Sequence, residues 1–381
     1  MHQRSPLGNA DITDEKLATL VADNLGVEQV ELLSSRAEVA PYDLEALTTA
    51  GRYWVRGRAR HGNGEDEFAM FVKVVQSFAR SPIFSFVPPE MREVALSMLP
   101  WESEPRVYLS DLADRLPEGL SMPRSFAVID LDADSAALWL EAVDIDATPW
   151  DDAVFGQAAY LLGRLSASPS VRPLAKVGRD VGVHAVRGYA EGRIAHEVVP
   201  ALRDDSTWAH PLVEPWFDNR LRRDLLRVAD RLPVLLDELE TLPVGASHGD
   251  ACPRNLLREK GRDGFVAIDF GFWGETQLGF DLAQLLVGEV QLGERSADCL
   301  PALEELCVRE YVDGLAAEGT VVPEQGVRRA HAICMMIFAG LSAIPFEHLG
   351  SPLDDRLHAI SRTRAESVRF MLDLLVGTDR S

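Results

Sequence analysis

The chain has 381 residues, of which 46% are hydrophobic, enough for one bilobal enzyme or two domains with substantial cores. Its formal net charge of -22 makes nucleic acid a poor partner, because a polyanion would be repelled. That charge would suit a cationic small-molecule substrate, although an acidic surface also serves solubility. The four cysteines have neither the spacing of a zinc site nor the density of a disulfide scaffold.

No targeting or membrane segment is evident in the sequence. The first residues, MHQRSPLGNADITDEK, lack the apolar core of a signal peptide. No uninterrupted apolar run is long enough to span a bilayer. We therefore expect a cytoplasmic protein with no membrane partner.

The first part of the chain predicts one helix followed by strands. Residues 13–25 place apolar side chains at helical spacing, and Gly26 ends the pattern. The turn residues His61, Gly62, Asn63 and Gly64 are typical of a hairpin between two strands. Strand-like runs occupy residues 30–39, 52–59, 67–75, 125–130 and 136–143. Beyond Pro149 helical patterns dominate, notably at residues 153–167, 221–239 and 302–317.

One segment carries an ordered set of polar residues that suits phosphoryl transfer. Residues 248–255 read HGDACPRN, and an apolar strand then leads to Asp269, Phe270 and Gly271. Magnesium takes hard oxygen ligands, so Asn255, Asp269 and nucleotide phosphates are enough to hold it. Asp250, kept off the metal, can orient an acceptor hydroxyl and take its proton. The alternative, polar loops that merely flank a core strand, explains so demanding an order less well.

Lys73 is the second sequence signal. It interrupts the apolar, β-branched run FAMFVKVV at residues 68–75, which predicts a buried strand. Burying an ammonium group is costly unless it meets an anion, so we interpret Lys73 as a phosphate ligand rather than a surface residue.

HGDACPRN together with IDFG resembles the aminoglycoside phosphotransferase and choline-kinase-like branch of the protein-kinase-like fold, known as the phosphotransferase enzyme family. The resemblance implies an α+β, bilobal fold. A small β-rich N-terminal lobe (residues 1–141) would bind nucleotide, and a larger, mostly helical C-terminal lobe (residues 142–381) would carry catalysis and the substrate site.

The resemblance also implies roles for the motif residues. Asp250 would be the catalytic base, Asn255 and Asp269 would bind Mg²⁺, and His248 and Asp281 would support the loop. Asp281 equally fits an N-cap of the helix that begins at Leu282, and the two roles are compatible.

Further nucleotide contacts follow from the same resemblance. The family places a glutamate on the helix after the lysine strand, and Glu104 fits by its spacing to Tyr108, with Glu102 as a rival. Residues 141–143 would join the lobes, with Glu141 and Val143 near the adenine. No GxGxxG is present. Thr49 and Gly51 are therefore the candidates for a phosphate loop, although an ordinary turn explains them equally well.

The implied activity is ATP-dependent transfer of the γ-phosphoryl group to a hydroxyl of a small molecule, with Mg²⁺. An aminoglycoside or amino sugar is the best single candidate, and a choline- or sugar-type metabolite kinase is the alternative. A non-catalytic nucleotide-binding regulator would usually have lost one of Lys73, Asp250, Asn255 and Asp269. Candidate carboxylates for the acceptor site are Glu275, Glu347, Asp354 and Asp355.

Overall fold

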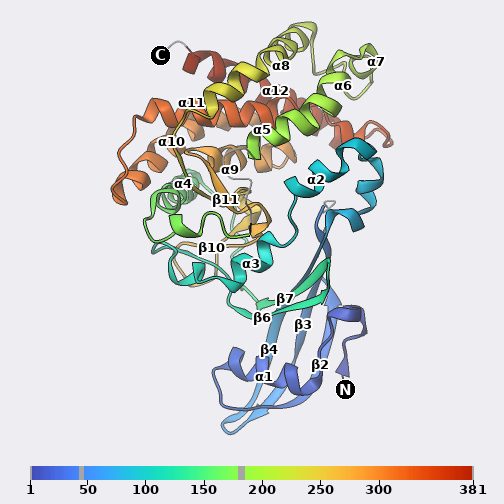
Figure 1. Ribbon diagram of the computed structural model, residues 1–381, viewed down its shortest axis with the longest axis vertical. Helices are drawn as coiled ribbons and strands as arrows, with labels where there is room; N and C mark the ends of the chain where they lie inside the picture. The colour runs from blue at the N-terminus through green and yellow to red at the C-terminus, as the bar shows by residue number, and fades with distance from the viewer. Residues whose placement is uncertain (1, 43–46, 179–184, 380–381) are drawn as a thin grey trace.

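The computed structural model describes residues 2–42, 47–178 and 185–379 of the chain. Figure 1 shows a sheet at one end of the molecule and a helical body at the other. The N-terminus lies beside the sheet and the C-terminus lies in the helical body. Among the residues described, no helix is long and apolar enough to cross a membrane.

Six strands form the main sheet, in the order β1-β2-β3-β4-β7-β6. Their bounds are β1 (His2–Gln3), β2 (Glu31–Val39), β3 (Thr49–His61), β4 (Gly64–Gln76), β6 (Ser125–Asp132) and β7 (Ser135–Glu141). All neighbours are antiparallel except β1 and β2. The five predicted strands are confirmed. β3 and β4 are longer than predicted because their pairing continues to a tight turn between His61 and Gly64.

Helix α1 (Asp14–Leu25) packs on this sheet and closes the core of the small lobe. Thr13 caps it by accepting a hydrogen bond from the Lys16 amide, and Gly26 ends it with a left-handed φ of 67°. Leu17 and Val21 are fully buried and belong to the same cluster as the inward-facing strand residues. The predicted helix and its end at Gly26 are therefore confirmed, and Thr13 is the N-cap rather than the first helical residue.

In the described part of the chain, the main helices are two short ones between β4 and β6 and a longer series after β7. They are α2 (Arg92–Met98) and α3 (Ser103–Leu109), then α4 (Asp152–Ala167), α5 (Ala185–Tyr189), the π-helical η8 (Ala190–Val198), α6 (Val199–Arg203), α7 (Asp205–Trp208), α8 (Asn219–Leu239), α9 (Phe280–Gln291), α10 (Leu300–Ala317), α11 (Glu324–Met335) and α12 (Asp355–Asp379). The helices predicted at residues 153–167, 221–239 and 302–317 are confirmed as α4, α8 and α10, each of which begins slightly earlier.

Short strands between α8 and α9 carry the polar motif. β8 (Val244–Ser247) pairs with β11 (Gly274–Gln277), and β10 (Phe265–Ala267) pairs with β5 (Leu120–Ser121) and β9 (Leu256–Leu257). These pairs fix the two loops of the motif against the helical body, because each loop begins where a short strand ends.

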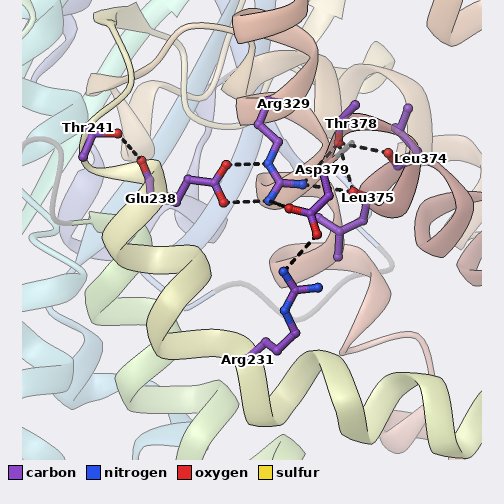
Figure 2. Close-up of polar contacts among 8 residues, drawn as sticks. All are labelled: Arg231, Glu238, Thr241, Arg329, Leu374, Leu375, Thr378 and Asp379. Atoms are coloured by element: carbon purple, nitrogen blue, oxygen red, sulfur yellow. Dashed lines mark hydrogen bonds and ion pairs between the residues drawn. The ribbon is translucent and has the colours of Figure 1, made fainter. Parts of the chain in front are cut away.

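The C-terminal helix is fastened to the body by a buried arginine (Figure 2). Arg329 of α11 is bidentate to Glu238 of α8, with both distances 2.6 Å, and it donates to the carbonyl of Leu375 in α12 at 2.9 Å. Arg231 of α8 adds an ion pair to Asp379 at 3.1 Å. Three helices far apart in the sequence thus share one charge network.

Candidate active site

The segment after β8 forms a tight loop held by buried groups. His248 is 1% exposed, and its Nε2 lies 2.9 Å from the carbonyl of Ile268. Burial lowers the pKa of His248, so the ring is neutral and Nε2 carries the proton that the carbonyl accepts. Gly249 has a φ of 85°, and a Cβ there would come within 2.1 Å of the Phe272 carbonyl oxygen. Only glycine fits this position between His248 and Asp250.

Asp281 clamps this loop from α9. Its carboxylate accepts hydrogen bonds from the amides of His248 and Gly249 and from the hydroxyl of Ser247, each at 2.9 Å. It does not cap the helix. The N-cap position is Gly279, and Asp281 lies inside the first turn. The N-cap interpretation of Asp281 is therefore wrong, because its side chain is turned to the loop amides instead.

A second anchor lies directly behind β8. Ser166 of α4 donates to the carbonyl of Ala246 at 2.7 Å and accepts from the Tyr311 hydroxyl of α10 at 2.8 Å. All three residues are buried. Two long helices thus fix the strand that leads into the loop. This contact was not predictable from the sequence, because it joins three distant segments.

Asp250 follows in the loop and meets Asn255. The Asn255 amide nitrogen donates to the Asp250 carboxylate and to its carbonyl oxygen, both at 2.9 Å. Burial, and then the nearby charge of Asp269, raise the pKa of Asp250 to about 7. A carboxylate with such a pKa is suited to take a proton near neutral pH.

Asp269 lies just beyond β10 in an unusual backbone conformation. Its φ of 64° makes it the one non-glycine residue with positive φ in the described part of the chain. Such strain costs free energy and persists where the surroundings hold it, often at functional sites. Phe270 after it is buried, whereas the Asp269 side chain remains 30% exposed. The strained turn therefore directs a carboxylate out of a packed core.

Lys73 joins the two lobes at this carboxylate. Its Nζ lies 2.9 Å from Asp269 Oδ1 and 2.5 Å from Glu104 Oε2. Burial works to lower the pKa of Lys73, but the charges of Asp269 and Glu104 outweigh it, so the pKa is raised and the ammonium stays charged. Glu102, by contrast, pairs with Arg106 on the surface. Of the two rivals, Glu104 is the one that contacts Lys73.

Tyr108 continues this contact into the motif. It lies one turn after Glu104 in α3, and its ring packs edge-on against Phe270, with 5.9 Å between centroids. Helix α3 thus touches both Lys73 and the segment that carries Asp269. The spacing from Glu104 to Tyr108, which suggested the pair in the sequence, has a packing role in the structure.

The predicted phosphate loop is different in the structure. Thr49 and Gly51 belong to strand β3 and pair with Val75 and Val74 of β4, with an irregular register between them. Residues 43–46, which precede them in the chain, lie outside the described residues. The loop placement of Thr49 and Gly51 is wrong, because the β3–β4 pairing begins earlier than the hydrophobic pattern indicates.

Sequence reasoning also missed Arg52. Its Nη2 lies 3.5 Å from Asp269 Oδ2, and its side chain is 13% exposed. The residue lies directly opposite Lys73 in the β3–β4 register. Opposite residues in an antiparallel pair share a face of the sheet, so the hairpin register could have brought Arg52 to attention.

The two candidate metal ligands offer oxygen donors. Asn255 uses its nitrogen for Asp250, which leaves its carbonyl oxygen as the coordinating atom, and Asp269 presents a partly exposed carboxylate. One carboxylate and one amide suit Mg²⁺, which keeps waters and shares phosphate ligands. Across the described ranges no group of three or more His, Cys, Asp and Glu side chains forms a metal site. The donor set therefore fits a metal that arrives with a nucleotide.

Residues 106–304 match the model of the phosphotransferase enzyme family, which is just over half of the chain. An aminoglycoside phosphotransferase structure from Alicyclobacillus acidocaldarius is 16% identical, with a TM-score of 0.51 over 89% of this chain and 95% of that one. The chain is also similar to a spectinomycin phosphotransferase in complex with ADP and spectinomycin, at 12% identity and a TM-score of 0.48 over 97% and 99%. The comparison with curated proteins found no match. The fold is thus the bilobal, protein-kinase-like α+β fold.

Proposed function

We propose that this chain, which belongs to the phosphotransferase enzyme family and is a small-molecule phosphotransferase, transfers the γ-phosphoryl group of ATP to a hydroxyl of its substrate. The observation that carries the proposal is the meeting of Lys73 from the sheet with Asp269 from the motif, at 2.9 Å. A cation and a metal-binding carboxylate from opposite lobes then lie where a triphosphate would enter between them.

The residues around this point divide the work of phosphoryl transfer. A divalent metal, for which Mg²⁺ is our candidate, would be held by Asn255 and Asp269 and would neutralise phosphate charge. Lys73 binds the phosphates as a positive charge that Glu104 keeps in place. These contacts position the nucleotide, and positioning with charge neutralisation provides most of the catalysis in this reaction.

Asp250 is the proposed catalytic base. Asn255 holds its carboxylate at one oxygen, Oδ2, which leaves the other oxygen for the acceptor hydroxyl. The raised pKa, about 7, lets Asp250 accept the hydroxyl proton as the hydroxyl oxygen bonds to the γ-phosphorus and the bond from that phosphorus to ADP breaks. His248 and Asp281 act through the backbone of the loop, because Asp281 accepts from the amides of His248 and Gly249, and His248 Nδ1 accepts from the Asp250 amide.

We place the boundary between the lobes after Glu141, where β7 ends, and the adenine at residues 141–143. The Glu141 amide is already used by the Arg124 carbonyl, at 2.9 Å. Within the described residues, no hydrogen bond uses the backbone of Ala142 or Val143. Those groups are thus available to an adenine edge. A preference for ATP over GTP would support an adenine contact here, since the two bases present different hydrogen-bonding edges.

For the acceptor, we propose an amine-bearing alcohol, with an aminoglycoside or amino sugar as first choice and choline- or sugar-type metabolites as the alternative. The net charge of -22 supports a cationic substrate. Two of the candidate carboxylates are already engaged, since Glu347 pairs with Arg364 at 2.7 Å and Asp354 accepts from the Leu357 amide at 2.8 Å. Glu275 and Asp355 remain as candidates.

The proposal is tested by an acceptor panel. Purified protein with Mg²⁺ and ATP is incubated with aminoglycosides, amino sugars, amino alcohols and neutral sugars, and each product is analysed by mass spectrometry. We expect one phosphoryl group to be added to an amine-bearing member. Phosphorylation of neutral sugars alone would contradict the amine preference. Failure of every acceptor, with no nucleotide binding, would contradict the kinase function itself.

A further inference from the structure

We infer that Arg52 is a second cationic phosphate ligand, which holds Asp269 while the site is free of nucleotide and turns to the β- and γ-phosphates when metal and nucleotide bind. This inference rests on the proposed function and adds a residue to it. No role at the site follows for Arg52 from the motif, because the residue lies far from it in the sequence.

The geometry begins with the hairpin. Arg52 in β3 and Lys73 in β4 are direct partners in the antiparallel register, so their side chains leave the same face of the sheet. Both reach the same carboxylate. Lys73 Nζ lies 2.9 Å from Asp269 Oδ1, and Arg52 Nη2 lies 3.5 Å from Oδ2. Each oxygen of Asp269 therefore has its own cation from the small lobe.

The guanidinium of Arg52 is also supported from its other side. Its central carbon lies 3.5 Å from the centroid of the Tyr42 ring, a cation–π contact. With 13% exposure, the side chain is largely removed from water. Arg52 is thus a shielded cation held in one orientation. A surface arginine would lose side-chain entropy if it were held in one place.

The other arginines of the same strand provide the contrast. Arg56 pairs with Glu38 of β2, Arg58 pairs with Glu65 of β4, and Arg60 pairs with both Glu31 of β2 and Glu65; the three arginine side chains are 41%, 57% and 51% exposed. These pairs join neighbouring strands on the surface. Arg52 instead reaches out of its sheet to Asp269 of the helical lobe. Within the described residues, Asp269 is its one ion-pair partner.

The exchange of partners follows from charge. A metal ion on Asp269 would take over the carboxylate, and the 3.5 Å contact of Arg52 is the longer of the two, so it is the one most readily given up. The freed guanidinium would face the triphosphate, and its planar fork of donors matches phosphate oxygens. The small lobe has no GxGxxG, so Arg52 would supply donors that a glycine-rich loop provides through its backbone.

The test is calorimetric titration of ATP, ADP and AMP with Mg²⁺ into the full chain. Arg52→Gln removes the charge, Arg52→Lys keeps the charge without the fork, and Arg56→Gln is the matched control on the same strand. We expect Arg52→Gln to weaken the binding of ATP and ADP roughly tenfold to hundredfold, the range for loss of a hydrogen bond to a charged group. The affinity for AMP should be unchanged. Arg52→Lys should fall between wild type and Arg52→Gln, and Arg56→Gln should bind like wild type.

Two results would overturn the inference while leaving the proposed function intact. One is wild-type ATP affinity in Arg52→Gln. The other is an equal loss of ATP and AMP affinity in both Arg52 variants, which would mean that Arg52 supports the sheet rather than the phosphates. Absence of ATP binding by the wild-type chain is a different outcome, because it would overturn the proposed function together with this inference.

Discussion

Glu104 holds Lys73 in a buried ion pair, with the two residues 3% and 4% exposed. A buried pair is strongly affected when one partner is removed, because the remaining charge is left without compensation. Here Asp269 is a second partner for Lys73, so loss of Glu104 would leave the lysine drawn toward Asp269 alone. The position of the phosphate-binding ammonium, rather than its charge, would then change.

We therefore predict that Glu104→Gln lowers kcat/KM by about 100-fold, the effect of misplacing one electrostatic group in an active site. Glu102→Gln is the matched control, two residues earlier in the chain, where the carboxylate is partly exposed and pairs with exposed Arg106. Steady-state kinetics with an acceptor from the panel decide the matter. Equal losses in the two variants would contradict the assignment of Glu104.

His331 of α11 is fully buried, and neither ring nitrogen has a hydrogen-bond partner in the described structure. Burial, with the charge of Arg328 acting in the same direction, lowers the pKa of His331 to about 3. In the unfolded chain the same ring titrates near its ordinary value of 6.5. Below pH 6.5 the unfolded state therefore binds a proton at this ring, whereas the folded state binds it only near pH 3. The free energy of unfolding thus falls as the pH decreases from about 6.5 to about 3.

We predict that His331→Gln removes up to about 1.4 kcal/mol of acid sensitivity per pH unit between pH 6 and pH 4, the contribution of one proton. The measurement is urea unfolding across this range. His196→Gln, at an exposed position, should leave the slope unchanged. The same slope in His331→Gln and wild type would show that His331 is not the group responsible.

The predicted site residues agree best with the structure where the local sequence alone determines the environment of the residue. Lys73 stood out because an ammonium group in an apolar strand needs an anion, and Asp250, Asn255 and Asp269 stood out by their order. Arg52 did not, because nothing in a strand of alternating arginines distinguishes the one that leaves the sheet. That distinction depends on the register and on the position of Asp269 in the other lobe.

Helices α4 and α10 pack with their backbones close together at two glycines. A Cβ at Gly163 would come within 2.1 Å of the Tyr311 carbonyl oxygen, and one at Gly314 within 2.1 Å of the Tyr160 carbonyl oxygen. The two glycines therefore let each helix rest on the backbone of the other. This contact matters for the site, since α4 also carries Ser166, which anchors β8.

We predict that Gly163→Ala destabilises the fold by about 1–3 kcal/mol, the usual cost of overpacking, because the helices must separate. Gly326→Ala is the matched control in α11, where a Cβ meets nothing within 4 Å. It should be neutral or stabilising by up to about 1 kcal/mol, since alanine favours the helix. Denaturant unfolding of both variants gives the comparison, and a stable Gly163→Ala protein would contradict the close packing.

Elements with a clear period were predictable, and those without one were not. Regularly repeated apolar positions predict the amphipathic helices α1, α8 and α10 and the long strands. The short strands β5, β8, β9 and β11 have two to four residues each, too few for a period, and their pairing is decided by distant segments. The π-helical η8 between α5 and α6 gave no signal either.

The two lobes meet at the site, and each lobe has its own internal contacts. Arg329 and Glu238 join α8, α11 and the end of α12 within the helical body (Figure 2), while α1 closes the sheet. Contacts of Lys73 and Arg52 with Asp269 then bring charged groups of the two lobes together. A nucleotide and its metal would enter at this meeting point, so binding and catalysis depend on both lobes at once.

The most direct test of the account is single-turnover transfer of the γ-phosphoryl group from Mg²⁺-ATP to an acceptor from the panel, in wild type and in Asp250→Asn at saturating nucleotide. We predict that the variant binds Mg²⁺-ATP like wild type but transfers at least about 100-fold more slowly, because the acceptor hydroxyl has lost its base. Transfer at the wild-type rate by Asp250→Asn would contradict the account.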